Sequence, residues 1–360
     1  MSSPGRYTGI INQYRELLPV TDSTRIITLN EGNTPLIRLQ NLAKQWINVD
    51  ADIFVKYEGL NPTGSFKDRG MTMAVTQAVS EGARGIICAS TGNTSAAAAA
   101  YAARAGIKAF VIIPEGKIAQ GKLAQAMIYG AITMQLKGNF DQGMQMVKDV
   151  AAQADVAIVN SINPYRLQGQ KTAAFEIVEA LGRAPDFHCL PVGNAGNISA
   201  YWMGYSEYQR HGQCGQRPVM VGYQAEHAAP FIHGEMIDNP ETLATAIRIG
   251  RPQSWDKAWQ ASKDSQGWFD RLPDAKILAA QAALASYEGV FCEPASAASI
   301  AGLARDLRTG KIPAGSQIVC TLTGHGLKDP AIAIDQAKGA VLIPVEADLD
   351  EVRKAILSHS

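Results

Sequence analysis

Lys67 is the residue whose position most suggests chemistry. It lies in the run NPTGSFKDRG at residues 61–70, after the strand-like DIFVKYE and before the helix-like GMTMAVTQAV. A lysine at such a junction is either an ordinary solvated charge or a reactive amine held where a strand passes into a helix. An amine of the second kind is a nucleophile toward carbonyl groups. Lys67 is therefore a candidate catalytic residue.

The loop GNAGN is a candidate phosphate site. It follows the apolar run DFHCLPV and precedes a helix-like segment, so its backbone amides lie at a predicted helix N-terminus, which favours an anion. The loop has neither the GxGxxG pattern of dinucleotide sites nor the GxxxxGK pattern of nucleoside triphosphate sites, so a single phosphate is the economical ligand. A tight turn without a ligand is the alternative. The residues concerned are Gly193, Asn194, Ala195, Gly196 and Asn197.

Two other loops leave predicted strands with polar residues. STGNT contributes Ser90, Asn93 and Thr94, which suit a helix cap and an anion, although a capped turn without a ligand fits this motif at least as well. TLTGHG offers the hydroxyl of Thr321 or Thr323 to a flat ligand, and its His325 is a candidate general base, although a lone histidine between glycines more often has a structural role. An amine, one phosphate site and polar groups around a flat ring together fit pyridoxal 5'-phosphate.

The elements that must position these loops are short β-branched runs alternating with longer alanine-rich ones. This alternation predicts an α/β fold with mostly parallel sheets, in which ligands bind beyond the carboxyl ends of the strands. Two domains around a cofactor cleft are expected, a larger one from residues 1–67 and 161–360 and a smaller one from residues 68–160. Residues 239–274 are interpreted as an irregular insertion over the surface. The predicted strands cover residues 85–89, 109–113, 131–136, 157–160, 186–192, 219–224, 290–293 and 317–323, and the predicted helices cover residues 95–105, 140–153, 171–181, 198–209, 275–287 and 297–306.

Composition excludes several classes of protein. The 360 residues are 46% hydrophobic and 18% charged, which is typical of a globular chain long enough for two domains. Lys+Arg and Asp+Glu both number 33, so neither nucleic acid nor an anionic membrane is an expected partner, and no apolar run reaches the ~20 residues of a membrane helix. The five cysteines are odd in number and lack metal-binding spacing, so no metal is expected. A cytoplasmic protein is expected.

A family resemblance rests on four runs. SFKDRG, STGNTSAA, GNAGN and TGHGLKDP, in this order and at these distances, resemble the pyridoxal-phosphate enzymes related to the β subunit of tryptophan synthase, which are called fold type II. EGNTPLIRL at residues 31–39 and SINPYRLQGQKT at residues 161–172 extend a resemblance to the threonine synthases within that family over most of the chain. The resemblance implies two α/β domains with the cofactor between them, and a homodimer.

The resemblance also implies roles for the residues around the cofactor. Lys67 would form the Schiff base with pyridoxal 5'-phosphate and would act as acid and base. Asn93 would hydrogen-bond the ring hydroxyl, and residues 193–197 would bind the phosphate. Thr323 would face the pyridine nitrogen, where a neutral hydroxyl would not enforce a fully protonated ring.

The implied substrate is O-phospho-L-homoserine, which would react with water to give L-threonine and phosphate. Its phosphate needs an anion site of its own, for which Asn160, Ser161 and Arg166 are the candidates, because arginine grips a phosphate with two donors. Ser90 and Thr94 would hold the substrate carboxylate, and Thr94 would assist at Cβ.

Three alternatives share parts of this pattern. A threonine or serine dehydratase, or another β-elimination or β-replacement enzyme of this fold, would use the same lysine, but the dehydratases typically carry SAGNHA where this chain has STGNTSA. A regulator that binds the cofactor without turnover is opposed by the intact Lys67, and a nicotinamide dehydrogenase is opposed by the absence of GxGxxG. Arg166 and the asparagines of GNAGN favour a phosphorylated substrate.

Overall fold

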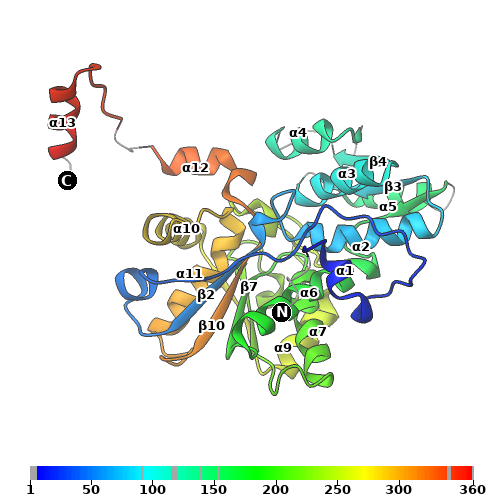
Figure 1. Cartoon of the computed structure of the whole chain (residues 1–360), viewed down its shortest axis with the longest axis horizontal. Coiled ribbons are helices and arrows are strands. Elements are labelled where there is room, and N and C mark those ends of the chain that lie inside the picture. Colours follow the sequence, from blue (N-terminus) through cyan, green and yellow to red (C-terminus); the bar gives the residue numbers. More distant parts are fainter. Residues whose placement is uncertain are drawn as a thin grey trace. The chain divides into compact units, whose positions relative to one another are not determined.

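The computed structural model describes residues 6–90, 92–114, 120–137, 140–151, 154–338 and 342–358. The chain forms two compact units, Met1–Asp329 and Pro330–Ser360. The second unit contains helices α12 (Pro330–Gln336) and α13 (Leu349–Leu357). All the candidate site residues lie in the first unit, which Figure 1 shows as two sheets surrounded by helices.

The larger sheet has six strands in the order β1-β2-β10-β7-β8-β9. Strand β1 runs antiparallel to β2, and every other neighbouring pair in this sheet is parallel. Because parallel strands end at the same edge, the loops that follow β7 and β10 are brought together there. The strands are β1 (Leu36–Arg38), β2 (Asp52–Tyr57), β7 (Phe187–Pro191), β8 (Val219–Ala225), β9 (Trp268–Leu272) and β10 (Gln317–Leu322).

The smaller sheet has four parallel strands in the order β5-β4-β3-β6. Its strands are β3 (Gly85–Ala89), β4 (Lys108–Pro114), β5 (Ile132–Leu136) and β6 (Val156–Ile158). Strands β3 and β6 are neighbours, so the loop that begins at Ser90 and the loop that contains Ser161 leave the sheet at the same edge. These two loops are the contribution of this sheet to the site.

Helices cover both faces of each sheet (Figure 1). Along β10, Ile318, Cys320 and Leu322 pack against α10 and α11, whereas Val319 points to the opposite face and packs with α6, α7 and α9. This period of two is what a strand buried on both faces requires. The helices of the first unit are α1 (Ile10–Gln13), α2 (Lys67–Ser80), α3 (Asn93–Ala105), α4 (Gln120–Ile128), α5 (Phe140–Ala151), α6 (Pro164–Leu181), α7 (Gly196–Arg210), α8 (Pro230–His233), α9 (Trp255–Asp264), α10 (Asp274–Glu288) and α11 (Pro294–Arg308).

Short helical turns connect these elements, and the helix ends follow local sequence rules. Helices α6 and α11 begin with a proline, whose missing N–H is not needed in the first turn. The five short turns are η1 (Arg15–Leu17), η2 (Ala43–Ile47), η3 (Glu58–Leu60), η4 (Thr245–Ile247) and η5 (Gly326–Lys328).

The predicted α/β class with two mostly parallel sheets is confirmed, but two local predictions are wrong. Residues 290–293 form no strand, because they are the loop that leads into α11, and Cys292 makes only an isolated bridge to His325. Residues 239–274 are not a surface insertion, because they contain α9 and β9, the edge strand of the larger sheet. The alternation in WFDRL was too short and too polar to mark β9 from sequence.

Candidate active site

Helix α2 begins at Lys67, so the candidate amine lies at a helix N-terminus as its sequence context predicts. The turn before it is fixed by Asp68, whose carboxylate accepts hydrogen bonds from the Thr63 backbone N–H at 2.7 Å and from its hydroxyl at 2.5 Å. Burial of the Lys67 amine and the nearby Arg166 guanidinium lower the pKa of Lys67 to about 7, against an opposing effect of Glu293. Near neutral pH, much of this amine is therefore a free base.

Arg69, two residues after Lys67, holds the same turn through hydrogen bonds to two buried carboxylates. Its guanidinium donates two hydrogen bonds to Glu58, at 2.7 and 2.8 Å, and two to Glu176, each at 2.7 Å. Burial alone would raise the pKa of Glu176, but Arg69 and Lys56 hold it down at about 2. Arg69 is fully buried, and its planar fork matches both carboxylates. The motif SFKDRG thus fixes Lys67 through the two residues that follow it.

Glycines bring α6 against α2, and with it Arg166. A Cβ at Gly169 of α6 would lie 1.8 Å from the Arg69 carbonyl oxygen, and a Cβ at Gly70 of α2 would lie 3.0 Å from the Arg166 carbonyl oxygen. The two backbones therefore approach at a distance that only glycine allows at Gly169. This contact sets Arg166 into the cavity that holds Lys67.

Arg166 is a buried cation with little to bind. It is 1% exposed, and among the described residues its one hydrogen bond runs from Nη1 to the Val159 carbonyl oxygen at 3.2 Å. Its Nε and Nη2 have no hydrogen-bond partner among the described residues. Burial lowers the pKa of Arg166 to about 10, which reflects the cost of enclosing a charge without an anion. The free N–H groups of this guanidinium could therefore bind an anionic ligand.

A second candidate anion site lies at the start of α7. Ala195 precedes the helix in the left-handed conformation, with φ 61° and ψ 2°, so the backbone turns sharply as it enters Gly196. Gly193 packs against another backbone, since a Cβ there would lie 2.9 Å from the Ile247 Cα. The first N–H groups of a helix have no partner within it, so the amides at this turn suit a phosphate.

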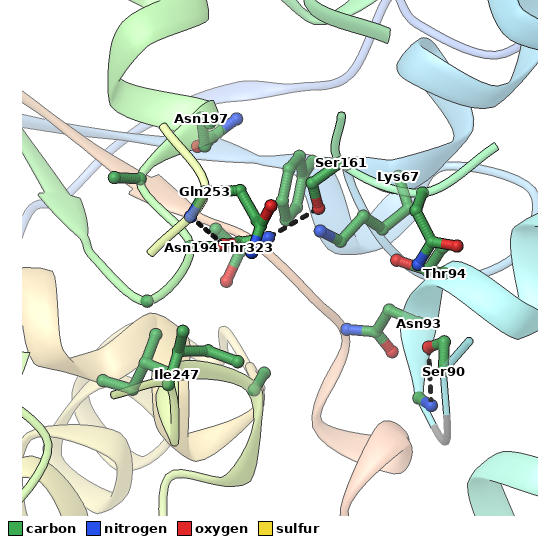
Figure 2. A pocket seen from close by; sticks show the side chains of 18 of the residues that line it. Lys67, Ser90, Asn93, Thr94, Ser161, Asn194, Asn197, Ile247, Gln253 and Thr323 are labelled. Carbon is green, nitrogen blue, oxygen red and sulfur yellow. Dashed lines mark hydrogen bonds between the residues drawn. The ribbon is translucent and has the colours of Figure 1, made fainter. Parts of the chain in front are cut away.

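Asn194 connects the two candidate anion sites. Its side-chain Nδ2 donates to the Ser161 hydroxyl at 2.6 Å, and its Oδ1 accepts from the Gln253 backbone N–H at 2.6 Å. Both bonds are drawn in Figure 2. Because the Ser161 oxygen accepts from Asn194, its own hydrogen is available to a ligand. The Asn194 side chain is thus occupied in holding Ser161 and Gln253 together. Only the backbone of Asn194 would contact a cofactor phosphate.

Asn160 is more constrained than its sequence context suggested. Its Oδ1 accepts from the Ala89 N–H at 3.0 Å and its Nδ2 donates to the Ala89 carbonyl oxygen at 2.9 Å, so it clamps the end of β3. One hydrogen of Nδ2 remains for a ligand. Ser90, in the loop after β3, and Thr94, in the first turn of α3, line the same cavity. Residue 91, which belongs to this predicted loop, lies outside the described residues.

Asn93 and Thr323 both contact a residue, Glu293, that was not predicted from the sequence. Asn93 Nδ2 donates to the two Glu293 carboxylate oxygens at 3.2 and 3.3 Å, and the Thr323 hydroxyl donates to one of them at 3.3 Å. Glu293 is 1% exposed. A sequence signal existed, because Glu293 immediately precedes the proline that begins α11. The mistaken strand at 290–293 concealed it.

These groups surround one cavity of about 710 Å³ (Figure 2). In Figure 2 the Lys67 side chain extends from α2 toward Thr323 and Asn194, with Asn93 below it. All thirteen predicted site residues line this cavity, and so do Glu293 and Gln170. Residues 245–249 and Gln253 form another part of its wall, which the sequence interpretation had assigned to a surface insertion.

His325 has a structural role. Its Nδ1 accepts from the Leu327 backbone N–H at 3.1 Å and so caps η5, and its ring stacks on Tyr57 at 6.1 Å between centroids. It is absent from the lining of the described cavity. The candidate general base is therefore Lys67 and not His325.

Comparison with known proteins decides the family. Residues 27–324 match the family model "Pyridoxal-phosphate dependent enzyme". A threonine synthase from Synechocystis is 58% identical over 99% of this chain and 92% of its own length, and one from Halalkalibacterium halodurans is 54% identical over 98% of this chain and 99% of its own. The chain belongs to the threonine synthase family. The family assignment makes it a pyridoxal-phosphate-dependent enzyme.

Solved structures of more distant proteins share the fold. Cysteine synthase from Entamoeba histolytica superposes with a TM-score of 0.74 at 19% identity, over 95% of this chain and 99% of that one. Maize serine racemase gives a TM-score of 0.73 at 19% identity, over 92% of this chain and 98% of that one. These likenesses confirm the fold type II architecture. In the described residues, no helix has the length and apolar character needed to cross a membrane.

The cavity fits the cofactor of the family. Lys67 supplies an amine, the start of α7 supplies amides for one phosphate, and the buried Oδ1 atoms of Asn93 and Asn197 have no hydrogen-bond partner among the described residues. Unsatisfied buried polar atoms are rare, so their presence around one cavity indicates a polar ligand. Pyridoxal phosphate carries a carbonyl group, a phosphate and a polar ring, which match these groups.

Proposed function

We propose that this chain converts O-phospho-L-homoserine and water into L-threonine and inorganic phosphate. The observation that carries the proposal is the buried Arg166 guanidinium, whose Nε and Nη2 have no partner among the described residues and which lines the same cavity as the candidate phosphate site at the start of α7. One anion site suits the cofactor phosphate, and the other suits a phosphate on the substrate. A dehydratase acting on free threonine or serine has no use for the second.

In this proposal the substrate is held at both ends. Ser161 and Arg166, with the remaining hydrogen of Asn160, bind the phosphate through charge-assisted hydrogen bonds. Ser90 and Thr94 bind the substrate carboxylate near the start of α3. These contacts place the carbon chain of the substrate beside the Lys67 amine. Holding both ends fixes Cα, Cβ and Cγ before any proton moves.

Lys67 would hold the cofactor and move the protons. Bound pyridoxal phosphate supplies an electron sink for charge that develops next to the substrate amino group. Once the substrate amine has replaced Lys67 on the cofactor, the freed Lys67 amine takes the proton from Cα. A proton is also lost from Cβ as phosphate leaves Cγ. Water adds its oxygen at Cβ, where Thr94 would assist, and protons return to Cγ and Cα. A pKa of about 7 suits Lys67 both to accept and to return protons near neutral pH.

The groups around the cofactor have separate tasks in this proposal. The backbone of residues 193–197 binds the cofactor phosphate, Asn93 hydrogen-bonds the ring hydroxyl and Thr323 faces the ring nitrogen. These assignments are supported by the position of the residues, which line one cavity with Lys67. The smaller domain of residues 68–160 would carry Ser90, Asn93 and Thr94 against the rest of the site.

The proposal includes a homodimer in the cytoplasm. The resemblance to the threonine synthases supports the dimer, and the five cysteines, all free and buried, suit a reducing compartment. Light scattering on the purified protein tests the dimer, because it should give the mass of two chains.

Product analysis tests the reaction. The cofactor-loaded protein is mixed with O-phospho-L-homoserine in one tube and with L-threonine in another, and both are followed by proton and phosphorus NMR. The proposal requires threonine and phosphate in equal amounts in the first tube. Unchanged substrate there, with 2-oxobutyrate in the second, would assign a dehydratase instead.

A further inference from the structure

Gln170 is a buried amide in the cavity that has no task in the reaction as proposed. It lies on α6 one turn after Arg166, it is 4% exposed, and it lines the same cavity as Arg166 and Lys67. Its Oε1 is buried and has no hydrogen-bond partner among the residues that the structure describes. A buried amide oxygen without a donor is unfavourable, so a glutamine at this position requires an explanation.

The Gln170 amide lies beside the stem of the Arg166 side chain. The position that a Cβ would take at Gly70 of α2 is 2.9 Å from Gln170 Nε2 and 3.2 Å from Arg166 Cβ, so both side chains pack over the same point. Residues four apart on a helix lie on one face, and their side chains lean toward the helix N-terminus. The Gln170 side chain is therefore directed back along α6 toward the Arg166 guanidinium.

The unpartnered atoms of these two side chains are complementary. In the described part of the chain, Arg166 has donors without partners at Nε and Nη2, and Gln170 has an acceptor without a partner at Oε1. Nε is the donor nearest the stem of the arginine, which is where the Gln170 amide lies, whereas the two Nη atoms are at its far end. A hydrogen bond from Nε to Gln170 would leave both Nη atoms to grip a phosphate, apart from the one Nη1 hydrogen that the Val159 carbonyl oxygen accepts.

We propose that Gln170 is a positioning residue of the substrate-phosphate site, whose Oε1 accepts a hydrogen bond from Arg166 Nε and so directs the Nη donors of Arg166 at the phosphate. The inference rests on the proposed function, because it assigns Arg166 to a phosphate on the substrate. Val159 holds the guanidinium at Nη1, and Gln170 holds it at Nε. A guanidinium held at two atoms loses less freedom when the ligand binds, so it binds the anion more tightly.

The test measures the preference of the site for a phosphonate. Cofactor-loaded proteins are titrated with the phosphonate analogue of O-phospho-L-homoserine and with 2-aminopentanoate, and binding is followed by visible absorbance. Gln170→Met keeps the length of the side chain and removes the acceptor. Gln168→Met is the matched control, because Gln168 lies on the same helix and is absent from the described lining of the cavity. Thermal unfolding checks that each variant folds, and Gln170→Leu serves if Gln170→Met does not.

The loss of one hydrogen bond to Arg166 should be visible in binding and in turnover. Gln170→Met should lose about three- to tenfold of the wild-type preference for the phosphonate, and its KM for O-phospho-L-homoserine should rise by a similar factor with kcat unchanged. Its affinity for 2-aminopentanoate should stay that of wild type, and Gln168→Met should match wild type throughout. Equal weakening of both ligands in Gln170→Met would show a general disturbance of the cavity and would contradict the inference.

A double variant separates positioning from direct contact. If Gln170 acts only through Arg166, Gln170→Met should have no further effect on the preference in the Arg166→Met protein. A further loss there would mean that the Gln170 amide contacts the phosphonate itself. That result, or a full preference in Gln170→Met alone, would overturn the inference and leave the proposed function standing. A wild type without any preference for the phosphonate would contradict the proposed function and the inference with it.

Discussion

The Arg166 guanidinium and the Lys67 amine line the same cavity, and burial together with the Arg166 charge lowers the pKa of the Lys67 amine to about 7. The same residue that would bind the substrate phosphate therefore also helps to keep the candidate catalytic amine unprotonated. A bound phosphate would partly neutralise Arg166. Substrate binding and the basicity of Lys67 are thus coupled through one charge.

Replacing Lys67 removes the amine on which the proposed reaction depends. Lys67→Ala should lower kcat by at least about 10²–10⁴-fold, because both cofactor attachment and proton transfer are lost. It should also abolish the visible absorbance of the lysine-bound cofactor. Lys44→Ala, at an exposed lysine on η2, is the control and should match wild type. Normal turnover in Lys67→Ala would exclude Lys67 as the catalytic amine.

The lowered pKa of Lys67 predicts how cofactor capture depends on pH. Only the unprotonated amine attacks a carbonyl, so the rate at which apoprotein captures pyridoxal phosphate should rise with pH through about 7 and then level off. Removal of the Arg166 charge should raise the pKa, so the midpoint should move to higher pH in Arg166→Met. Stopped-flow absorbance measures this rate. A rate that keeps rising toward the ordinary lysine pKa of 10.5 would show that the amine is not perturbed.

The Arg69 network should carry much of the stability around the site. Arg69→Met leaves Glu58 and Glu176 without their shared partner, which should lower the free energy of unfolding by about 3–5 kcal/mol. The matched control is Arg38→Met, because Arg38 pairs with Asp52 at the surface and should cost about 0–1 kcal/mol. Urea denaturation of both variants measures the difference. Equal losses of unfolding free energy in the two variants would show that the buried network stabilises the protein no more than the surface pair does.

The close approach of α2 and α6 should be sensitive to one methyl group. Gly169→Ala would place Cβ 1.8 Å from the Arg69 carbonyl oxygen, so the two helices must separate, at a cost of about 1–3 kcal/mol. Separation also moves Arg166 relative to Lys67, so KM for the phosphorylated substrate should rise. Gly215→Ala is the control, because its Cβ meets nothing within 4 Å. Wild-type stability and KM in Gly169→Ala would contradict this account of the contact.

The α/β class and the site loops could be predicted from sequence because their signals are local. Alternating β-branched and alanine-rich runs mark strands and helices, and parallel strands oblige the loops of Lys67, Gly193 and Thr323 to meet at one edge. The contributions of Glu293 and of residues 245–253 could not be predicted in this way. Their positions depend on packing between segments far apart in the chain, such as Gly193 against Ile247 and Gly324 against Glu293. No local pattern encodes such contacts.

The Asn160 and Asn194 side chains illustrate a second limit. Both residues lie in the predicted loops, yet Asn160 is bound to Ala89 and Asn194 to Ser161 and Gln253. From residue type alone, both side chains suit ligand binding as well as they suit these structural hydrogen bonds. Only the tertiary hydrogen bonds separate a group that meets a ligand from one that supports its neighbours.

The central claim is that Arg166 forms a substrate-phosphate site, and its loss should have a specific effect. Removing an unpaired buried charge should not lower the thermal stability of Arg166→Met, since the guanidinium has no carboxylate partner among the described residues. Arg166→Met should instead bind the substrate phosphate more weakly. The variant should therefore lose phosphate binding while it keeps its thermal stability.

The most direct measurement is a binding titration of the cofactor-loaded protein, followed by its visible absorbance. One ligand is the phosphonate analogue of O-phospho-L-homoserine, and the other is 2-aminopentanoate, which has the same carbon chain without the phosphonate. Wild type should prefer the phosphonate by about 100-fold, and Arg166→Met should lose at least about tenfold of that preference. An equal preference in the two proteins would show that the substrate phosphate binds elsewhere and would contradict the account.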